Sequence, residues 1–536
     1  MENKLNIGMA FSGGGYRAAT FDLGTLSFLN SIRLDDGRTL LDCVSVLSSV
    51  SGGTIPAMRY MLARARGEDV DQMIEELFDF LCNGDLVGLA MEGLSAEKAN
   101  RNVSSIKMMA NIYDQHLFGN STMADIIDNF DRIPVKDYTA LATDFDSSLP
   151  FRFRLTEGRM TDGARMTYGV FGNNPHSIGR SIVRHITPGE ALACSSCFPS
   201  GFEPMVYPND FKVFQQPELA SQIKGHFSIM DGGVVDNQGI DPILLAEERM
   251  KKYREDKTRT DKALDLVIIS DVSTNHMDYY EPSEQIMPDS IGKLTLGRLR
   301  NYGLICEVVT TVLFILALVM GNNFWLGVVS VILAIVTLLN ISGALLKNKM
   351  FSAIGKTFIG DKAAFISHLK FATAEAMLMN RAKSLIIMTS EVFLKRLRQI
   401  NYSSIYNDET WCNRLVSSTI YELSTQTKWE SEHIMDTINE LVPSEAIQQN
   451  SDQAMNMGTT LWFTDKDKAK GLPQAVIAAG QYNICYNLLD YINKIEIDPT
   501  NTTEAHKLLI DCRPQLQEAW KKFQSNPQWM VPKRKD

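Results

Sequence analysis

Residues 44–55 read VSVLSSVSGGTI, and this stretch decides the fold expected of the 536-residue chain. The apolar run Val44–Val50 is followed by small residues and then by the helical pattern of Ile55–Arg66. A strand that turns sharply into a helix is the geometry of a nucleophile elbow, in which a strained serine needs small neighbours. Ser49 and the two glycines after Ser51 meet that need, which makes Ser51 a candidate nucleophile. An ordinary glycine-containing turn is the alternative.

Short apolar runs alternate with helical patterns throughout the first 275 residues. The expected strands are Leu5–Phe11, Cys43–Val50, Tyr138–Thr143, Phe151–Leu155 and Leu264–Ser270, and the expected helices are Phe21–Ile32, Ile55–Arg66, Val70–Leu81, Met123–Asn129 and Ile240–Lys252. This alternation predicts an α/β layer fold with a central, largely parallel sheet. Such sheets carry their reactive groups at the carboxyl ends of the strands.

A glycine-rich loop, FSGGGYR at residues 11–17, follows the first expected strand. Gly13, Gly14 and Gly15 allow the backbone N–H groups to turn inward, where they can bind a phosphate or a developing oxyanion. The G-x-G-x-x-G pattern and the G-K-[ST] ending of nucleotide-binding loops are both missing. We expect Arg17 to anchor this loop rather than to contact substrate.

A third motif, Asp231-Gly232-Gly233, ends another apolar stretch. Alone it reads as a tight turn, but beside an elbow serine its carboxylate can act as general base. The eight histidines show no context of a catalytic triad, so a Ser51–Asp231 dyad is the simpler hypothesis. An ordinary aspartate is a weak base toward serine, so partial burial would have to raise its pKa.

Residues 302–346 interrupt the α/β pattern with two apolar runs, Tyr302–Met320 and Phe324–Leu346. Each is long enough to cross a bilayer as a helix, and the short break between them predicts a transmembrane hairpin. Basic residues flank the hairpin and none lies at its tip: Lys293, Arg298 and Arg300 precede it, and Lys347, Lys349 and Lys356 follow it. By the positive-inside rule, both outer ends and the catalytic region face the cytoplasm. Buried core helices or a shallower insertion are the alternatives, and Glu307 lies either at the interface or against the partner helix.

Charge and cysteine content indicate which other ligands and compartments fit this chain. The formal charge of −10 argues against a nucleic-acid surface. The eight cysteines are scattered, as in a reducing compartment, and Cys194 and Cys197 are expected to be small packing residues rather than a metal or redox pair. The N-terminus lacks the pattern of a cleaved signal peptide. The motifs call for no metal and no cofactor, and oligomeric state stays open.

The motifs, in this order, resemble the patatin-like phospholipase family. Its G-G-G-x-R loop matches Gly13–Arg17, its G-x-S-x-G elbow matches Ser49–Gly53, and its D-G-[GA] motif matches Asp231–Gly233. Ala193–Pro204 is similar to the family's A-S-x-x-x-P-x-x-F-x-P stretch, and the run from Asp231 to Gly239 resembles a D-G-G-x-x-D-N-x-G form of bacterial members. One departure is Ser49, where the usual motif has glycine; serine is small enough for an elbow but leaves its tightest packing in question.

The resemblance implies a patatin-like three-layer fold and hydrolysis of a lipid ester through an acyl-serine, without metal. Ser51 would attack the acyl carbonyl and Asp231 would take and return the proton. Gly13, Gly14 and Gly15 would hold the oxyanion, and the supporting residues would be Arg17, Gly53, Gly232 and Gly233. A catalytically silent membrane scaffold or sensor, and a lipid acyltransferase using the same dyad, are the competing hypotheses.

We expect four parts: residues 1–300 as catalytic region, 301–347 as hairpin, 348–495 as a mainly helical completion of the catalytic unit, and 496–536 as a peripheral helix and tail. Helical periodicity after the hairpin covers Ala363–Ile387, Glu391–Ile400 and Leu472–Ile492. By resemblance, Arg381–Leu397, Thr459–Phe463 and Leu472–Gly480 look like the closing helices and strand of larger family members.

Overall fold

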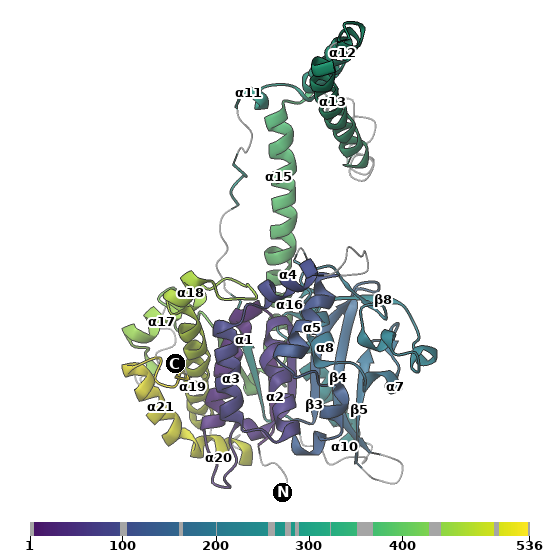
Figure 1. The fold of residues 1–536 in the computed structure, drawn as a ribbon. Coiled ribbons are helices and arrows are strands. Elements are labelled where there is room, and N and C mark those ends of the chain that lie inside the picture. Colours follow the sequence, from purple (N-terminus) through teal and green to yellow (C-terminus); the bar gives the residue numbers. More distant parts are fainter. Residues whose placement is uncertain are drawn as a thin grey trace. The chain divides into compact units, whose positions relative to one another are not determined.

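The computed structural model describes residues 5–96, 104–159, 165–199, 201–255, 263–273, 280–284, 289–321, 323–350, 368–427, 441–497 and 503–533. Two compact units divide the chain (Figure 1). The first combines Met1–Met277 with Thr389–Asp536, and the second is Asp278–Met388. The inserted unit is therefore wider than the expected 301–347, because it also includes helices on either side of the apolar pair.

A ten-stranded sheet forms the centre of the first unit. Its strands are β1 (Ile7–Phe11), β2 (Val44–Val50), β3 (Asp137–Asp144), β4 (Leu149–Arg159), β5 (Arg165–Gly172), β6 (Ser177–Ile178), β7 (Met205–Tyr207), β8 (Phe227–Asp231), β9 (Leu266–Asp271) and β10 (Leu415–Thr419). The order is β10-β9-β1-β2-β3-β4-β5-β6, and β8 pairs with both β3 and β7. Strands β10 to β3 are mutually parallel, and the pairs beyond them are antiparallel.

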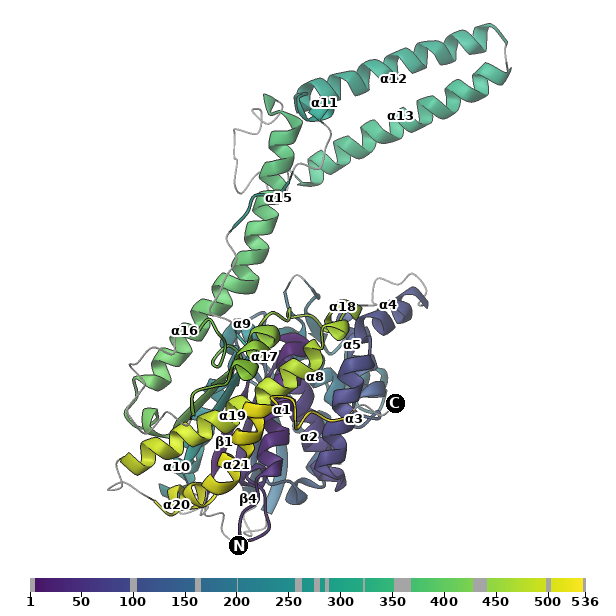
Figure 2. The same ribbon diagram turned by 90° about the vertical axis from the view of Figure 1, so that its left-hand side faces the viewer.

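Helices cover both faces of this sheet (Figures 1 and 2). In the first unit they are α1 (Gly15–Ser31), α2 (Thr54–Arg66), α3 (Val70–Asn83), α4 (Leu86–Ala96), α5 (Ser105–His116), α6 (Met123–Ile127), α7 (Arg180–Val183), α8 (Pro188–Ser196), α9 (Gly233–Asp236), α10 (Ile240–Glu255), α16 (Phe393–Tyr406), α17 (Glu445–Met455), α18 (Asp465–Ala469), α19 (Leu472–Ile497), α20 (Glu504–Asp511) and α21 (Arg513–Ser525). The expected α/β fold with a central sheet between helices is confirmed.

Strand periodicity explains the two-sided core. Successive side chains of a strand point to opposite faces. In β1, Met9 and Phe11 join the larger apolar cluster, which includes α1, α2, α8 and α19. Ala10 lies between them and joins a smaller cluster with Ile243 of α10 and Ile405 of α16. The apolar runs at the parallel strands are continuous because both faces are buried.

The C-terminal part of the chain packs directly on the N-terminal part. Helices α1 and α19 lie side by side, and each carries a glycine at the contact. A Cβ added at Gly24 would lie 2.2 Å from the Ile477 carbonyl oxygen, and one at Gly480 would lie 2.0 Å from the Phe21 carbonyl oxygen. Only glycine permits so close an approach of two helix backbones. Residues after the inserted unit thus complete the core around α1.

Several elements differ from the sequence expectation. Helix α1 begins at Gly15, six residues before the expected start at Phe21, because the glycine loop leads directly into it. No strand forms at Thr459–Phe463; the closing strand is β10 instead. Phe463 is buried and its ring packs against the Tyr16 ring, so its apolar character reflects core contact rather than strand pairing.

The last segment, expected as a peripheral helix and tail, holds both α20 and α21. Trp520 and Phe523 of α21 are buried in the larger apolar cluster, and the Phe523 ring lies 6.0 Å from the Phe28 ring of α1. The end of the chain therefore contributes to the core of the first unit.

The second unit contains α11 (Asp289–Gly292), α12 (Leu296–Val319), α13 (Asn323–Met350) and α15 (Phe371–Ile387). The expected helix Ala363–Ile387 falls partly outside the described residues, since 351–367 are not among them. Two stretches, Arg300–Val319 and Asn323–Ile341, are long and apolar enough to cross a membrane by length and composition alone. Their mean hydropathies are 2.3 and 2.4, and 6% and 0% of the residues are buried, which distinguishes them from core helices.

Glu307 faces the partner helix of this pair. Asn340 of α13 donates through its side-chain nitrogen to a Glu307 carboxylate oxygen at 2.8 Å and to the Gly303 carbonyl oxygen at 3.0 Å. A Cβ at Gly303 would lie 2.4 Å from the Asn340 amide oxygen, so glycine permits this approach. The one acidic side chain of the apolar run thus serves as a hydrogen-bond acceptor between the two helices.

Candidate functional site

Strand pairing brings Ser51 and Asp231 together. In β2, which runs parallel to β3, the last residue Val50 pairs with Leu141. In β8, which runs antiparallel to β3, the last residue Asp231 pairs with Ala142. Strand β4 pairs along the whole of β3, so β2 and β8 share the opposite edge and their carboxyl ends meet there. Ser51, the next residue after β2, therefore lies beside Asp231.

The elbow backbone is strained. Ser51 has φ of 50°, a left-handed conformation that L side chains rarely adopt. A Cβ at Gly52 would lie 2.0 Å from the Gly15 carbonyl oxygen, and one at Gly53 would lie 2.6 Å from the Ser12 carbonyl oxygen. Gly52 and Gly53 must therefore lack a side chain, because the backbone of the glycine loop packs directly against the elbow.

Asp231 is a buried carboxyl group. Burial raises its pKa to about 6, whereas the hydrogen bond from the Gly233 N–H, 2.7 Å from Oδ1, and the neighbouring Ser51 hydroxyl oppose that rise. Its second oxygen, Oδ2, is buried without a hydrogen-bond partner among the described residues. We interpret the two side chains as neighbours whose direct hydrogen bond is incompletely formed, as is common for catalytic pairs without substrate. A carboxyl with this pKa is ionised at neutral pH and is more basic than an ordinary aspartate.

Within the described part of the chain, the N–H groups of Gly14 and Gly15 have no hydrogen-bond acceptor, whereas that of Gly13 has one. The Gly13 N–H donates to the Asn237 carbonyl oxygen at 2.9 Å, so it is not available to a ligand. Gly14 and Gly15 precede the first hydrogen bond of α1, from the Ala18 N–H to the Gly14 carbonyl oxygen at 3.3 Å. Their N–H groups belong to the unpaired donors of a helix N-terminus. Gly13 matters sterically instead, because its Cβ would lie 3.2 Å from the Ser51 Cβ.

A segment distant in sequence holds the glycine loop. The guanidinium of Arg17 donates to the Met457 carbonyl oxygen at 2.7 Å, and the Tyr16 N–H donates to the Thr460 carbonyl oxygen at 2.8 Å. Burial lowers the pKa of Arg17 to about 10, which leaves it cationic at neutral pH. Arg17 thus contacts the supporting loop, and no sequence signal identified residues 457–460 as that support.

Gly15→Ala should destabilise the protein more than an equally strained substitution elsewhere. Gly15 has φ of 58°, and its Cβ would lie 2.4 Å from the Thr460 carbonyl oxygen. Gly37 is the matched control, since it has φ of 85° with nothing within 4 Å of its Cβ. The left-handed strain costs about 1–2 kcal/mol at both positions, and the collision adds to this only at Gly15. Thermal unfolding of the two variants measures the difference, and equal melting temperatures would contradict this contact.

The second glycine turn is equally close-packed. A Cβ at Gly232 would lie 2.2 Å from the Leu141 carbonyl oxygen, and one at Gly233 would lie 2.7 Å from the Asn237 amide oxygen. Asp236 then accepts from the N–H groups of Gln238, Gly239 and Asp241, which holds the loop that carries Asn237. Sequence reasoning did not assign roles to Asp236 or Asn237.

Cys194 and Cys197 are both buried packing residues. Burial raises the pKa of each thiol. The Cys197 thiol donates to the Ile229 carbonyl oxygen at 3.3 Å, and Cys194 contacts the Met205 sulfur at 3.4 Å. Across the described residues, no group of three or more potential ligands could hold a metal ion.

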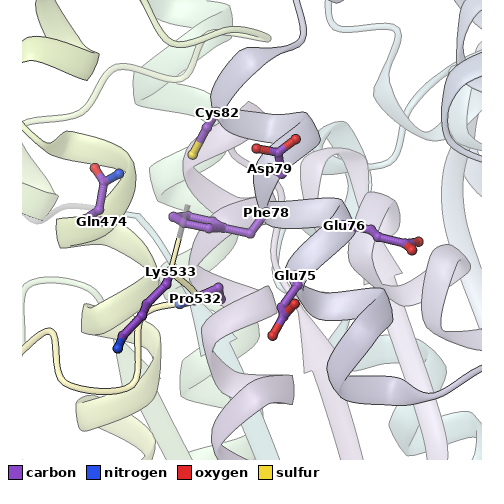
Figure 3. A pocket seen from close by; sticks show the side chains of 8 residues that line it. All are labelled: Glu75, Glu76, Phe78, Asp79, Cys82, Gln474, Pro532 and Lys533. Carbon is purple, nitrogen blue, oxygen red and sulfur yellow. The ribbon is translucent and has the colours of Figure 1, made fainter. Parts of the chain in front are cut away.

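A small surface hollow lies elsewhere, between α3 and the C-terminal residues Pro532 and Lys533 (Figure 3). Glu75, Glu76 and Asp79 give it an acidic lining. None of its lining residues belongs to the elbow, the glycine loop or the Asp231 turn, so this hollow is not the site of the dyad.

A strained serine after a parallel strand therefore lies beside a buried carboxyl and near two backbone N–H groups that have no hydrogen-bond partner among the described residues. Residues 9–244 match the family model of the patatin-like phospholipases. The resemblance that the motifs predict is thus confirmed for this region of the chain.

Two solved structures are similar to parts of the chain. One is human GIVD cytosolic phospholipase A2, with 14% identity, 50% of this chain and 43% of that chain covered, and a TM-score of 0.30. The other is the human enzyme in complex with methyl gamma-linolenyl fluorophosphonate and terbium chloride, with 19% identity, coverage of 38% and 34%, and a TM-score of 0.23. The chain spans less than half the length of either. No curated protein matches it.

Proposed function

We propose that the protein is a membrane-associated lipid acyl hydrolase in which Ser51 is the nucleophile and Asp231 the general base. The observation that carries this proposal is the meeting of β2 and β8 on one edge of β3, which brings a strained serine beside a buried carboxyl. The match of residues 9–244 to the patatin-like phospholipases supports a lipid hydrolase.

In the first half of the reaction, Asp231 accepts the proton of the Ser51 hydroxyl as the oxygen attacks the acyl carbonyl carbon. The new C–O bond moves the carbonyl π electrons onto oxygen. When the tetrahedral intermediate collapses, the ester C–O bond breaks and the leaving alkoxide takes the proton from Asp231. An acyl-serine remains. Water then repeats the sequence, with Asp231 again as base, to release the fatty acid and restore Ser51.

The oxyanion of each intermediate is assigned to the N–H groups of Gly14 and Gly15. Both lie at the N-terminus of α1, where the helix dipole also favours negative charge. The close packing of Gly52 against the Gly15 carbonyl keeps this loop next to the nucleophile. Arg17 supports the loop from behind through Met457.

Lipid vesicles of mixed composition test the activity. The full chain in detergent or proteoliposomes is incubated with phospholipids and neutral lipids, and mass spectrometry identifies free fatty acid and the deacylated product. A fluorophosphonate probe is applied to the same preparation. Hydrolysis with labelling at Ser51 supports the proposal, whereas intact lipids together with an unlabelled Ser51 would contradict it. Appearance of a new acylated lipid in place of fatty acid would indicate an acyltransferase.

The apolar pair α12 and α13 is proposed to anchor the enzyme in the bilayer that holds its substrate. We expect both ends of the pair on the cytoplasmic side, as the flanking basic residues favour. Cys412 in the first unit and Cys306 in α12 are the exposed cysteines of the described residues, which permits a thiol-labelling experiment.

In sealed vesicles, a membrane-impermeant maleimide should label Cys412 and the thiol introduced by Met320→Cys from opposite sides. Met320, at the tip, is 78% exposed. Cys306→Ser removes the other exposed thiol and serves as background. Labelling of both thiols from one side would contradict a spanning hairpin, and a tip thiol that reacts only in detergent would indicate a shallow insertion. Deletion of residues 302–346 should release the protein from membranes.

A further inference from the structure

Ser195, at the C-terminal end of α8, contacts Ser51 and also Gly232, the residue that follows Asp231. Its hydroxyl oxygen accepts the N–H of Ser51 at 2.9 Å. Its carbonyl oxygen accepts the N–H of Gly232, the residue after Asp231, at 3.1 Å. One fully buried residue therefore holds the backbone of the nucleophile turn and the backbone of the aspartate turn.

The elbow needs such a partner. The left-handed backbone of Ser51 turns its N–H into the interior, where a donor without an acceptor is costly. The Ser195 hydroxyl donates to the Leu141 carbonyl oxygen at 2.7 Å, so its oxygen can accept from Ser51. Leu141 is the β3 residue paired with the end of β2. The Ser195 side chain is thus tied to the strand on which both turns converge.

Further hydroxyl groups support Ser195. The Thr54 hydroxyl donates to the Ser49 oxygen at 3.1 Å and lies 3.1 Å from the Ser195 oxygen. Ser49 in turn lies 3.1 Å from the Tyr138 hydroxyl. All of these side chains are buried. Ser49, the departure from the glycine of the family motif, therefore fits the elbow and adds a hydrogen-bonding group beneath it.

We propose that Ser195 is a positioning residue for the acyl-transfer step, held in place by Thr54 and Ser49. By fixing the Ser51 backbone relative to the Asp231 turn, it orients the Ser51 hydroxyl toward the carboxylate. This inference rests on the proposed function. In this proposal the Ser49 and Thr54 hydroxyls help to position Ser195, which a glycine at position 49, having no hydroxyl, could not do.

Ser195→Ala tests this role, with Ser196→Ala as the matched control. Ser196 is the next residue, is also buried, and donates to the Leu192 carbonyl oxygen of its own helix at 2.8 Å. The readouts are the second-order rate of fluorophosphonate labelling at Ser51, kcat and KM for lipid hydrolysis, and the melting temperature. We expect Ser195→Ala to lower the labelling rate and kcat by about tenfold to a hundredfold. The reason is that the buried Ser51 N–H loses the Ser195 hydroxyl oxygen as its hydrogen-bond acceptor.

KM should change little, because buried Ser195 does not contact substrate, and Ser196→Ala should stay within about twofold of wild type in every rate. Should Ser195→Ala fail to fold, Thr54→Val removes the supporting hydroxyl at nearly constant shape, and a labelling rate lowered several-fold is expected. Ser49→Ala should give a smaller loss.

A folded Ser195→Ala that labels at the wild-type rate would overturn the inference, as would an equal loss in Ser196→Ala. If Ser195→Ala does not fold, a wild-type labelling rate in Thr54→Val would overturn it. Wild-type protein that neither labels at Ser51 nor hydrolyses lipid would instead overturn the proposed function itself.

Discussion

Replacing Ser51 by alanine is expected to lower lipid hydrolysis by roughly 10⁴- to 10⁶-fold and to abolish labelling by a fluorophosphonate probe. The methyl group cannot form the acyl intermediate, so only substrate binding and oxyanion stabilisation remain. The fold should be retained, because the alanine keeps the small volume that the crossing of the elbow and the glycine loop requires. The measurement is turnover of phospholipid vesicles followed by mass spectrometry, together with the melting temperature.

Ser45→Ala is the matched control. Ser45 lies on the same strand, β2, is buried, and its hydroxyl has no hydrogen-bond partner among the described residues. It lies at the opposite end of the strand from the elbow, so its loss should leave turnover within about twofold of wild type. A folded Ser51→Ala protein whose turnover of lipid falls by less than about a hundredfold would exclude Ser51 as nucleophile.

Asp231→Asn is expected to lower kcat by roughly 10²- to 10⁴-fold, the usual contribution of a general base. In the wild type, activity requires the carboxylate. Because burial raises the pKa of Asp231 to about 6, the rate should rise with pH, pass its midpoint near pH 6 and then level off. The residual rate of Asp231→Asn should lack this step. Initial rates measured between pH 4.5 and 8.5 give the profile.

Asp236→Asn tests whether the pH dependence of the rate comes from Asp231 or from Asp236, a second buried carboxyl group. Burial also raises the pKa of Asp236 to about 6, yet this group binds backbone N–H groups of its own loop. If Asp231 is the base, Asp236→Asn keeps the midpoint near pH 6 even where its overall rate is lower. A midpoint that disappears in Asp236→Asn but persists in Asp231→Asn would reverse the assignment.

Stability gives an independent readout for Asp231. Its pKa in the folded chain is higher than its ordinary value of 3.8, so the folded state binds the proton more tightly than the unfolded state. This contribution to stability is complete below about pH 4 and is lost as the pH rises through about 6. At neutral pH the ionised carboxyl therefore destabilises the fold. Asp231→Asn should be at least as stable as wild type while it is nearly inactive.

The elbow and the apolar pair could be predicted from sequence because each depends on its own residues. The strand before Ser51 and the helix after it follow from an apolar run and a helical pattern separated by glycines. The two apolar runs follow from length and composition in the same way. Strands β5, β6, β7 and β10 were not predicted: β6 and β7 have only two and three residues, and the sequences of β5 and β10, RMTYGVFG and LVSST, lack a continuous apolar run.

The sequence by itself determined which residues could react: a serine in a turn of small residues, an aspartate before two glycines, and a loop of three glycines. Only the tertiary structure decided how they act together. Ser51 and Asp231 lie side by side because β2 and β8 end at neighbouring residues of β3, and pairing register is a property of contacts distant in sequence. Contacts distant in sequence also pair the Gly13 N–H with the Asn237 carbonyl oxygen, bind Arg17 to a carbonyl 440 residues away, and place the Ser195 hydroxyl against the Ser51 N–H. Hydrophobic periodicity reports that a residue is buried, and it does not report which partner it meets there.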